Sequence, residues 1–156
     1  MRKALCAALA AIFALALGGC APVYQDHAQQ ELATGQLDAA AADVTAALSH
    51  DPNNLKLQNL AAQIFTQRGV QYYQGGEMIA ASDDFHRAIS YDPMYSRAYD
   101  YLGMLSFQQS NWQDAINYGD KAASLEGKPD PGYVAAARKN MQQTQLLRAP
   151  KLYRVR

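Results

Sequence analysis

The chain repeats itself between Phe65 and Ala122, where residues 65–98 read FTQRGVQYYQGGEMIAASDDFHRAISYDPMYSRA and residues 99–122 read YDYLGMLSFQQSNWQDAINYGDKA. At a lag of 34 residues the small residues of the two copies align, Gly69 with Gly103, Ala81 with Ala115 and Ala88 with Ala122. The same alanine spacing occurs once upstream, at Ala28, Ala40 and Ala47. A fixed period of this length indicates a repeat architecture.

Each copy predicts a pair of helices joined by a tight turn. The first helix of the middle copy has apolar or small residues at helical spacing, at Phe65, Gly69, Tyr72 and Tyr73. Gly75-Gly76 ends that helix, and the second helix stops before Asp92-Pro93. We expect the apolar face of the second helix to consist of Ile79, Phe85, Ala88 and Ile89.

This pattern resembles the tetratricopeptide repeat (TPR). The middle copy matches it at Phe65, Arg68-Gly69, Tyr72, Ala81, Phe85, Ala88 and Pro93, and the next copy at Tyr99, Leu102-Gly103, Ala115 and Ala122. Departures occur at Arg68, Ser106, Gly119 and Gly127, and the upstream copy matches best at its end, at Ala40, Val44, Ala47 and Asp51-Pro52. The resemblance implies an all-α fold, a TPR-like right-handed superhelix of about three helical hairpins plus a C-terminal capping helix. The alternative is three Ala-rich helix pairs that share the spacing by chance.

The repeats divide the chain into segments. Three TPR-like repeats are expected at about 24–53, 54–94 and 95–128, followed by a capping helix at 129–148 and a basic tail at 149–156. The Asp-Pro stops lie 41 residues apart rather than 34, and Leu55, Leu57 and Leu60 fall in the added residues, which predicts one long helix from Asn54 to Gln74. The capping helix should bury Tyr133, Val134, Ala137, Met141 and Leu147.

The N-terminus predicts export. Arg2 and Lys3 precede an apolar run that is too short to span a bilayer, and the run ends in Leu17-Gly18-Gly19-Cys20. These residues resemble a bacterial lipobox, which implies a signal peptide at 1–19, a short lipidated tether at 20–23, and acyl chains, palmitate among them, on Cys20. Ala21 then favours the periplasmic face of the outer membrane if the source is Gram-negative. The alternative is an ordinary secretory signal that leaves Cys20 as a spare thiol.

The resemblance also implies a partner-binding groove. First helices of TPR hairpins line a concave face, here through Gln63, Thr66, Val70, Tyr73 and Gln74 in one copy and Arg97, Asp100, Met104, Phe107 and Gln108 in the next. An apolar strip edged by amides suits a peptide or a partner helix. The Lys and Asn set with which TPR domains hold a C-terminal carboxylate is absent. Val70 and Phe107 could instead belong to the core between repeats.

The whole chain has equal numbers of basic and acidic residues, but they are distributed unevenly along the sequence. After Pro131 there are six basic residues and no acid, whereas residues 20–130 carry six basic and fourteen acidic residues. The tail residues Arg148, Lys151, Arg154 and Arg156 could meet an acidic partner or anionic lipid, or simply complement the end of the last helix.

Motifs for chemistry are not evident. His27 and Glu31 are spaced as metal ligands on a helix can be, but no third ligand is near, and in Asp83-Asp84-Phe85-His86 only Phe85 should face inward. We therefore expect no enzyme, metal, cofactor, nucleic acid or small-molecule substrate. The expected function is a protein-binding adaptor in the assembly of an envelope machine of the Flp, type IV pilus or secretin type, resembling pilotin-type TPR lipoproteins. The alternative is a scaffold that recruits peptidoglycan hydrolases or other cell-wall enzymes.

Overall fold

The structure is a computed structural model that describes residues 20–148, so the predicted signal peptide (1–19) and basic tail (149–156) lie outside the described residues. Between residues 20 and 148 the regular elements are seven α-helices, α2 (Cys20–Thr34), α3 (Leu37–His50), α4 (Leu55–Gln74), α5 (Met78–Tyr91), α6 (Ser96–Gln108), α7 (Trp112–Glu126) and α8 (Gly132–Arg148). None of these helices is both long enough and apolar enough to span a membrane.

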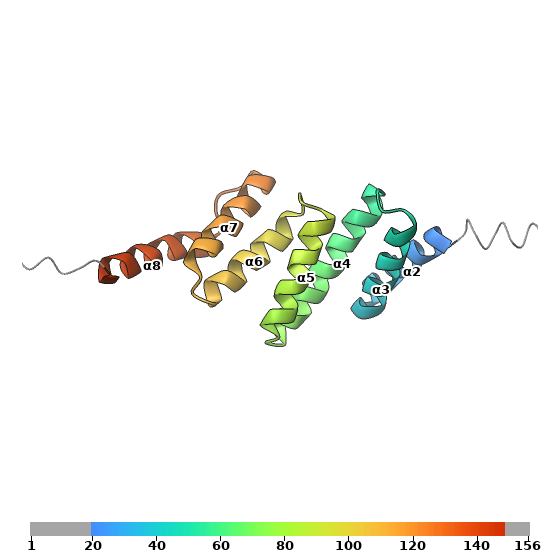
Figure 1. Cartoon of the computed structure of the whole chain (residues 1–156), viewed down its shortest axis with the longest axis horizontal. Helices are drawn as coiled ribbons and strands as arrows, with labels where there is room; N and C mark the ends of the chain where they lie inside the picture. Colours follow the sequence, from blue (N-terminus) through green and yellow to red (C-terminus); the bar gives the residue numbers. More distant parts are fainter. Residues whose placement is uncertain (1–19, 149–156) are drawn as a thin grey trace, which may run out of the picture.

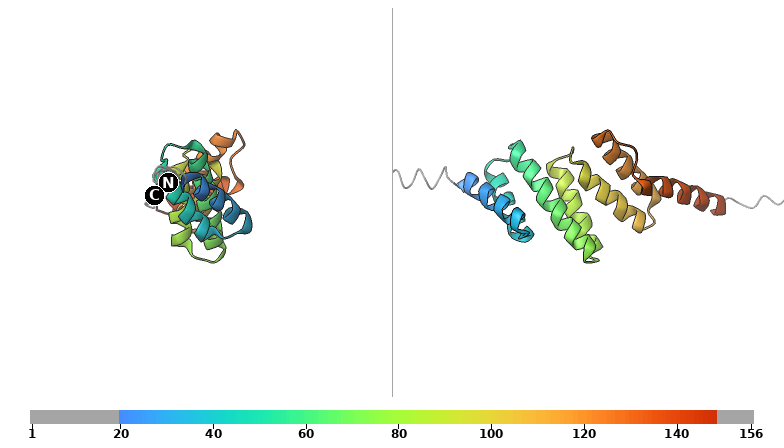
Figure 2. Two further views of the ribbon diagram at one scale, coloured as in Figure 1. Left: turned by 90° about the vertical axis from the view of Figure 1, so that its right-hand side faces the viewer. Right: turned by 180° about the vertical axis from the view of Figure 1, so that it is seen from behind.

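The helices pack as consecutive antiparallel hairpins, α2 with α3, α4 with α5 and α6 with α7, and α8 packs on α7 (Figure 1). Figure 1 shows an elongated array with α2 at one end and α8 at the other, and Figure 2 shows the same order from behind and a narrow cross-section end-on. Since each hairpin contacts mainly its neighbours in sequence, the array is built by stacking. The predicted all-α, TPR-like fold class is confirmed.

The turn inside each hairpin places one residue in the left-handed backbone region. Gly35 (φ +77°) and Gly76 (φ +81°) occupy this position in the first two hairpins, and Ser110 (φ +61°) occupies it in the third. Glycine adopts this conformation without steric cost, whereas for serine the same conformation carries a steric cost. The turns between hairpins follow Asp51 and Asp92, each of which is directly followed by proline.

The long helix α4 begins where the leucine pattern predicted. The side chain of Asn54 accepts hydrogen bonds from the backbone N–H groups of Lys56 (3.1 Å) and Leu57 (3.3 Å), which is N-cap geometry. Leu57 and Leu60 are buried, whereas Leu55, in the first turn, is exposed. The added residues therefore extend the helix by two turns and keep its buried face in register.

Small residues line the contacts within and between hairpins. The alanines of the repeat pattern, Ala28, Ala40, Ala47, Ala81, Ala88, Ala115 and Ala122, are all buried, as are Gly69 and Gly103. A Cβ on Gly69 would lie 2.7 Å from the ring of Phe85, so α4 and α5 approach closely only because this residue lacks a side chain. The core beside it contains Phe85, Ala81, Leu102 and Leu105.

The capping helix inserts two side chains into the third hairpin. A Cβ on Gly103 would collide with the hydroxyl of Tyr133, and a Cβ on Gly119 would collide with Val134. Gly119 stands where the middle repeat has Phe85, so the third hairpin lacks its own ring at this position and α8 supplies Tyr133 beside it. The departure at Gly119 from the repeat pattern therefore makes room for the cap.

Three expectations from the sequence are wrong. Ile79 is 80% exposed and Leu147 is 80% exposed, so neither contributes to the core. Asp84 is buried rather than on a solvated helix face. Residues 20–23, predicted as a short lipidated tether, lie in the first turn of α2.

Candidate functional site

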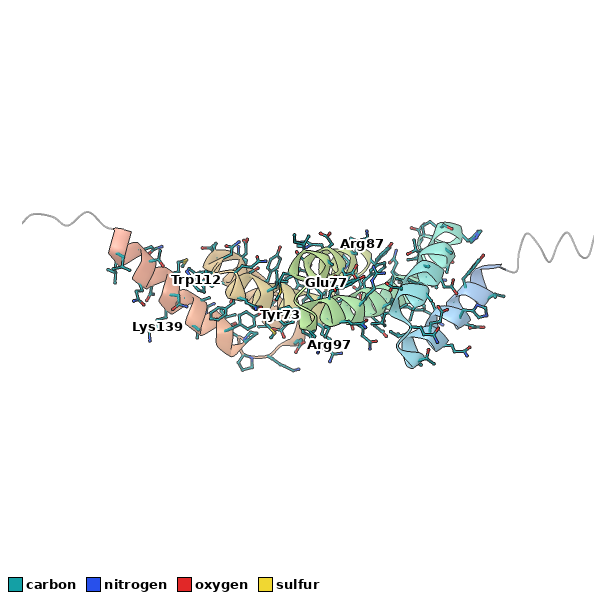
Figure 3. The ribbon with its side chains drawn as sticks, turned by 90° about the horizontal axis from the view of Figure 1, so that it is seen from below. Tyr73, Glu77, Arg87, Arg97, Trp112 and Lys139 are labelled. Atoms are coloured by element: carbon teal, nitrogen blue, oxygen red, sulfur yellow. The ribbon has the colours of Figure 1, made fainter. Side chains whose placement is uncertain are left out.

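The first helices of successive hairpins lie beside one another and form one face of the array. The helix α2 contacts α4, α4 contacts α6, and α6 contacts α8. Figure 3 shows Arg97 of α6 on one side of the array and Arg87 of α5 on the opposite side. Two hollows occur on the face made by α2, α4 and α6.

The hollow between α4 and α6, here called the α4–α6 pocket, has a volume of about 260 Å³. It is lined by Leu37 from α3, by Thr66, Gln67, Val70, Gln71 and Gln74 from α4, and by Tyr95, Arg97 and Tyr101 at the start of α6. Apolar and aromatic side chains thus meet a row of three amides and one cation. Such a lining can bury an apolar side chain and offer hydrogen bonds to the backbone around it.

Thr66 gives the pocket a buried polar group. The residue is 2% exposed, and its hydroxyl has no hydrogen-bond partner among the described residues. A threonine inside a helix ordinarily bonds to a carbonyl one turn earlier, as Thr45 does to Ala41 at 2.6 Å. A buried hydroxyl without a partner costs about 1–3 kcal/mol.

Arg97 is the cation of the pocket. It is exposed and takes part in no ion pair with another described residue. Tyr95 beside it is half-buried, and burial raises the pKa of Tyr95 while the Arg97 guanidinium opposes that rise. Arg97 is therefore available to an acidic group on a ligand, and Tyr95 remains a neutral hydroxyl.

A second hollow of about 490 Å³ lies between α2 and α4. Its lining combines amides, leucines and one lysine, namely Gln25, Gln29, Leu32, Leu55, Lys56, Asn59, Leu60 and Gln63. The amides of this hollow and those of the α4–α6 pocket follow one another along α4. Together the two hollows could hold an extended segment that crosses both.

The predicted groove residues are only partly brought together. Thr66, Val70, Gln74 and Arg97 line the α4–α6 pocket, and Gln63 lines the second hollow. Tyr73 packs on the core with Phe85, Met104 is half-buried, and Gln108 is exposed at the end of α6.

Two groove residues have other contacts. Asp100 accepts a hydrogen bond from the Tyr133 hydroxyl at 3.1 Å, so its carboxylate faces the cap. Phe107 contacts Trp112 and Tyr133, with ring centroids 5.4 Å and 6.2 Å apart, and belongs to the cluster beneath α8. The alternative that Phe107 belongs to the packing between elements therefore describes it better.

Sequence reasoning missed five residues of the pocket, Leu37, Gln67, Gln71, Tyr95 and Tyr101. Leu37 belongs to α3, the second helix of the preceding hairpin, so no pattern within one repeat includes it. Gln67 and Gln71 lie on α4 between the positions taken from the TPR pattern. A helical wheel of α4 could have indicated this polar stripe, but not which helix it faces.

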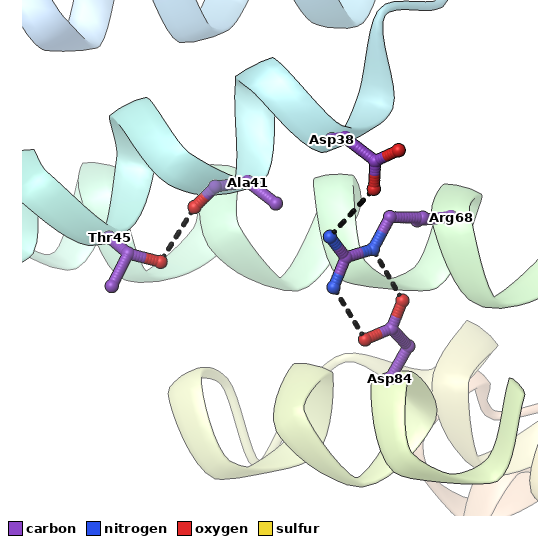
Figure 4. A network of polar contacts seen from close by, with 5 residues as sticks. All are labelled: Asp38, Ala41, Thr45, Arg68 and Asp84. Carbon is purple, nitrogen blue, oxygen red and sulfur yellow. Dashed lines mark hydrogen bonds and ion pairs between the residues drawn. The ribbon is translucent and has the colours of Figure 1, made fainter. Parts of the chain in front are cut away.

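A buried ion pair joins α4 and α5 within the second hairpin, and its arginine also reaches an exposed aspartate of the first hairpin (Figure 4). Arg68 Nε donates to Asp84 Oδ2 at 2.7 Å, and its Nη2 donates to Asp84 Oδ1 at 2.9 Å, while Nη1 reaches Asp38 of α3 at 3.1 Å. The hydrogen bonds to Asp84 raise the pKa of Arg68 above its ordinary value, so the guanidinium stays charged. The departure from Leu to Arg at position 68 is thus matched by an acid on α5.

The remaining titratable groups do not assemble a reactive centre in the described residues. No group of three or more His, Cys, Asp or Glu side chains is placed to hold a metal ion there. His86 contacts the Ser82 backbone carbonyl at 2.8 Å and the Tyr118 hydroxyl at 3.3 Å on an exposed surface. His27 lies 3.7 Å from Asp43 and does not pair with Glu31.

Between residues 20 and 148 the chain is thus a TPR-type array, with a pocketed face made by first helices and a closing helix that completes the last hairpin. No known family model matches the chain.

Two curated relatives match part of it. The chain is 32% identical over 88 residues to the DnaJ homolog subfamily C member 7 homolog of Dictyostelium discoideum, a match that covers 56% of this chain and 16% of that protein. It is 27% identical over 99 residues to small glutamine-rich tetratricopeptide repeat-containing protein 2 of Mycosarcoma maydis, which covers 64% of this chain and 28% of that protein. The chain therefore spans less than a third of either relative.

Among solved structures, one similar fold is the first TPR of Spaghetti (RPAP3) bound to the HSP90 peptide SRMEEVD. The TM-score is 0.48 with 21% sequence identity, and the alignment covers 81% of this chain and 94% of that chain.

Proposed function

We propose that this protein is a non-enzymatic adaptor whose α4–α6 pocket binds an extended segment of a partner protein. The observation that carries the proposal is the combination within one pocket of apolar and aromatic side chains, three neighbouring amides and Arg97, which forms no ion pair with another described residue. Glutamine side chains can donate to and accept from a peptide backbone at once. An acidic side chain of the partner would pair with Arg97.

We further propose that the adaptor is anchored at the periplasmic face of the outer membrane through lipid on Cys20, where it serves the assembly of an envelope machine of the Flp, type IV pilus or secretin type. Support for the proposed membrane location comes from the apolar N-terminal run and Leu17-Gly18-Gly19-Cys20. Support for the pathway comes from the resemblance of this layout to pilotin-type TPR lipoproteins.

Site-specific photocrosslinking in living cells tests the proposal. A photoreactive phenylalanine analogue replaces Gln71, which is exposed on the rim of the pocket. The matched control carries the same analogue at Asn117, which is exposed on α7. We expect a discrete adduct from position 71, weakened by Arg97→Glu, and none from position 117.

The identity of the adduct decides the finer part of the proposal. A pilin, secretin or traffic component supports the assembly role, whereas a cell-wall hydrolase replaces it with the scaffold role. Equal adducts from both positions, or an adduct at position 71 that Arg97→Glu leaves unchanged, contradict binding in the pocket.

A further inference from the structure

The tip of the second hairpin has an apolar hollow that neither the fold nor the α4–α6 pocket uses. This tip hollow has a volume of about 580 Å³ and is lined by Gly76, Glu77, Met78, Ile79, Ala80 and Asp83. Ile79, one of these lining residues, is 80% exposed. Figure 3 labels Glu77 between Arg87 on one side of the array and Arg97 on the other.

The other two hairpins show that this surface is not required by the repeat. In register, Ile79 corresponds to Asp38 and Gln113, both polar. Glu77 corresponds to Gln36 and Asn111, and Asp83 to Ala42 and Asn117, so the acids are also peculiar to the second hairpin. The repeat fold therefore does not require an exposed branched aliphatic side chain between two carboxylates at this position.

The two acids are free to meet a cation. Neither the Glu77 nor the Asp83 side chain forms a hydrogen bond or ion pair with another described residue, whereas Asp38, Asp84, Asp120 and Asp130 are all paired with arginines. A surface with an apolar centre and unpaired acids on its rim selects a segment in which apolar and basic residues alternate.

This chain contains one such segment. Residues 149–156 read APKLYRVR, in which Lys151, Arg154 and Arg156 are interspersed with Leu152, Tyr153 and Val155, and no acid occurs. Within one molecule α8 contacts α6 and α7 but neither α4 nor α5, so the third hairpin stands between the end of α8 and the tip hollow. At the end of the array in Figure 1, α8 instead points its C-terminus away from the second hairpin.

We propose that the tip hollow binds residues 149–156 of a second copy of this chain, with an apolar side chain of that segment on Ile79 and its cations on Glu77 and Asp83. The contact is heterologous, because the hollow and the segment are different surfaces, so it joins molecules head to tail. The tip hollow shares no lining residue with the α4–α6 pocket.

Analytical ultracentrifugation of residues 20–156 carrying Cys20→Ser tests this, with charge reversal on each side. We expect concentration-dependent self-association that weakens as salt is added. Glu77→Lys with Asp83→Lys should weaken it about tenfold or more, and Arg154→Glu with Arg156→Glu should do the same. The control, Asp26→Lys with Asp51→Lys, makes the same change in net charge elsewhere and should leave association unchanged.

Mixing the two charge-reversed variants gives the decisive result. Each variant then meets a surface of opposite charge on the other, so the mixture should associate more strongly than either variant does alone. Circular dichroism checks that both keep the helical content of the parent. A monomeric parent at all concentrations, or loss of association with no recovery on mixing, overturns the proposal. Tail reversal that abolishes binding to anionic phospholipid vesicles but not self-association also overturns it, in favour of a lipid-binding tail.

Discussion

At the scale of single residues, the pair of Arg68 and Asp84 shows how a departure from the repeat pattern is compensated. The Asp84 side chain is 4% exposed and the Arg68 side chain 15%, and two parallel hydrogen bonds join them. The guanidinium also lies 5.2 Å from the centroid of the Phe65 ring. Removing one partner of a buried pair leaves the other charged and desolvated.

We therefore predict that Arg68→Met lowers the free energy of unfolding by about 3 kcal/mol or more. Arg68→Met with Asp84→Leu should regain most of this loss, since an apolar pair of similar volume satisfies the buried site. Urea denaturation followed by circular dichroism measures both. Asp38→Ala is the control, because Asp38 is 85% exposed and an exposed ion pair contributes about 0–1 kcal/mol. A double variant as unstable as Arg68→Met would contradict this account.

Ser110 is the second residue with a local effect on stability. It holds φ at +61° where the other hairpins have glycine, and the left-handed region costs a non-glycine residue about 1–2 kcal/mol. Ser110→Gly should therefore stabilise the protein by about 0.5–1 kcal/mol, after the entropy that glycine adds to the unfolded chain. The reverse change, Gly76→Ser, should destabilise it. Thermal unfolding measures both effects. A lower unfolding midpoint for Ser110→Gly would contradict the proposed backbone strain at Ser110.

At the scale of helices, α8 is an integral part of the third hairpin rather than a separate lid. Tyr133 fills the space beside Gly103, and Val134 fills the space beside Gly119. Burial, followed by the Asp100 carboxylate, raises the pKa of Tyr133 well above that of an exposed tyrosine, as expected for a ring inserted between helices. Val134 and Ala137 are fully buried by the same packing.

We predict that Gly119→Ala lowers the free energy of unfolding by about 1–3 kcal/mol, because its methyl group would overlap Val134 and push α8 outward. Val134→Ala removes the colliding group. In a double-mutant cycle the two changes should therefore be less costly together than the sum of their separate effects. Chemical denaturation of the four proteins tests this, and strict additivity would show that the two residues do not compete for space.

At the scale of the whole molecule, the proposed lipid anchor on Cys20 would set the distance between the array and a membrane. Residues 20–23 form helix rather than extended chain, so they span about 6 Å instead of about 13 Å. If Cys20 carries lipid, the first hairpin stands directly at the membrane surface. The array then extends away from it toward α8.

We predict that Cys20→Ser releases the protein from the membrane fraction, because each buried methylene of an acyl chain contributes about 0.8 kcal/mol to anchoring. The protein that retains Cys20 should stay in the membrane fraction at high salt and be extracted by detergent. Lys151→Glu with Arg154→Glu is the control and should remain in the membrane. If Cys20→Ser still sediments with membranes after a salt wash, lipid on this cysteine is not the anchor.

Features that depend on neighbours along one helix could be predicted from the order of the residues. The period of 34 residues, the Asp-Pro stops and the leucines before Gln63 were enough to predict the hairpins and the long α4, because helical periodicity and turn chemistry are local. Contacts between side chains of different helices became known only from the fold. Asp84 is buried because Arg68 of another helix pairs with it, Phe107 lies under α8, and the α4–α6 pocket takes Leu37 from a preceding hairpin. Such contacts depend on how helices rotate and cross, and no spacing within a single repeat encodes that.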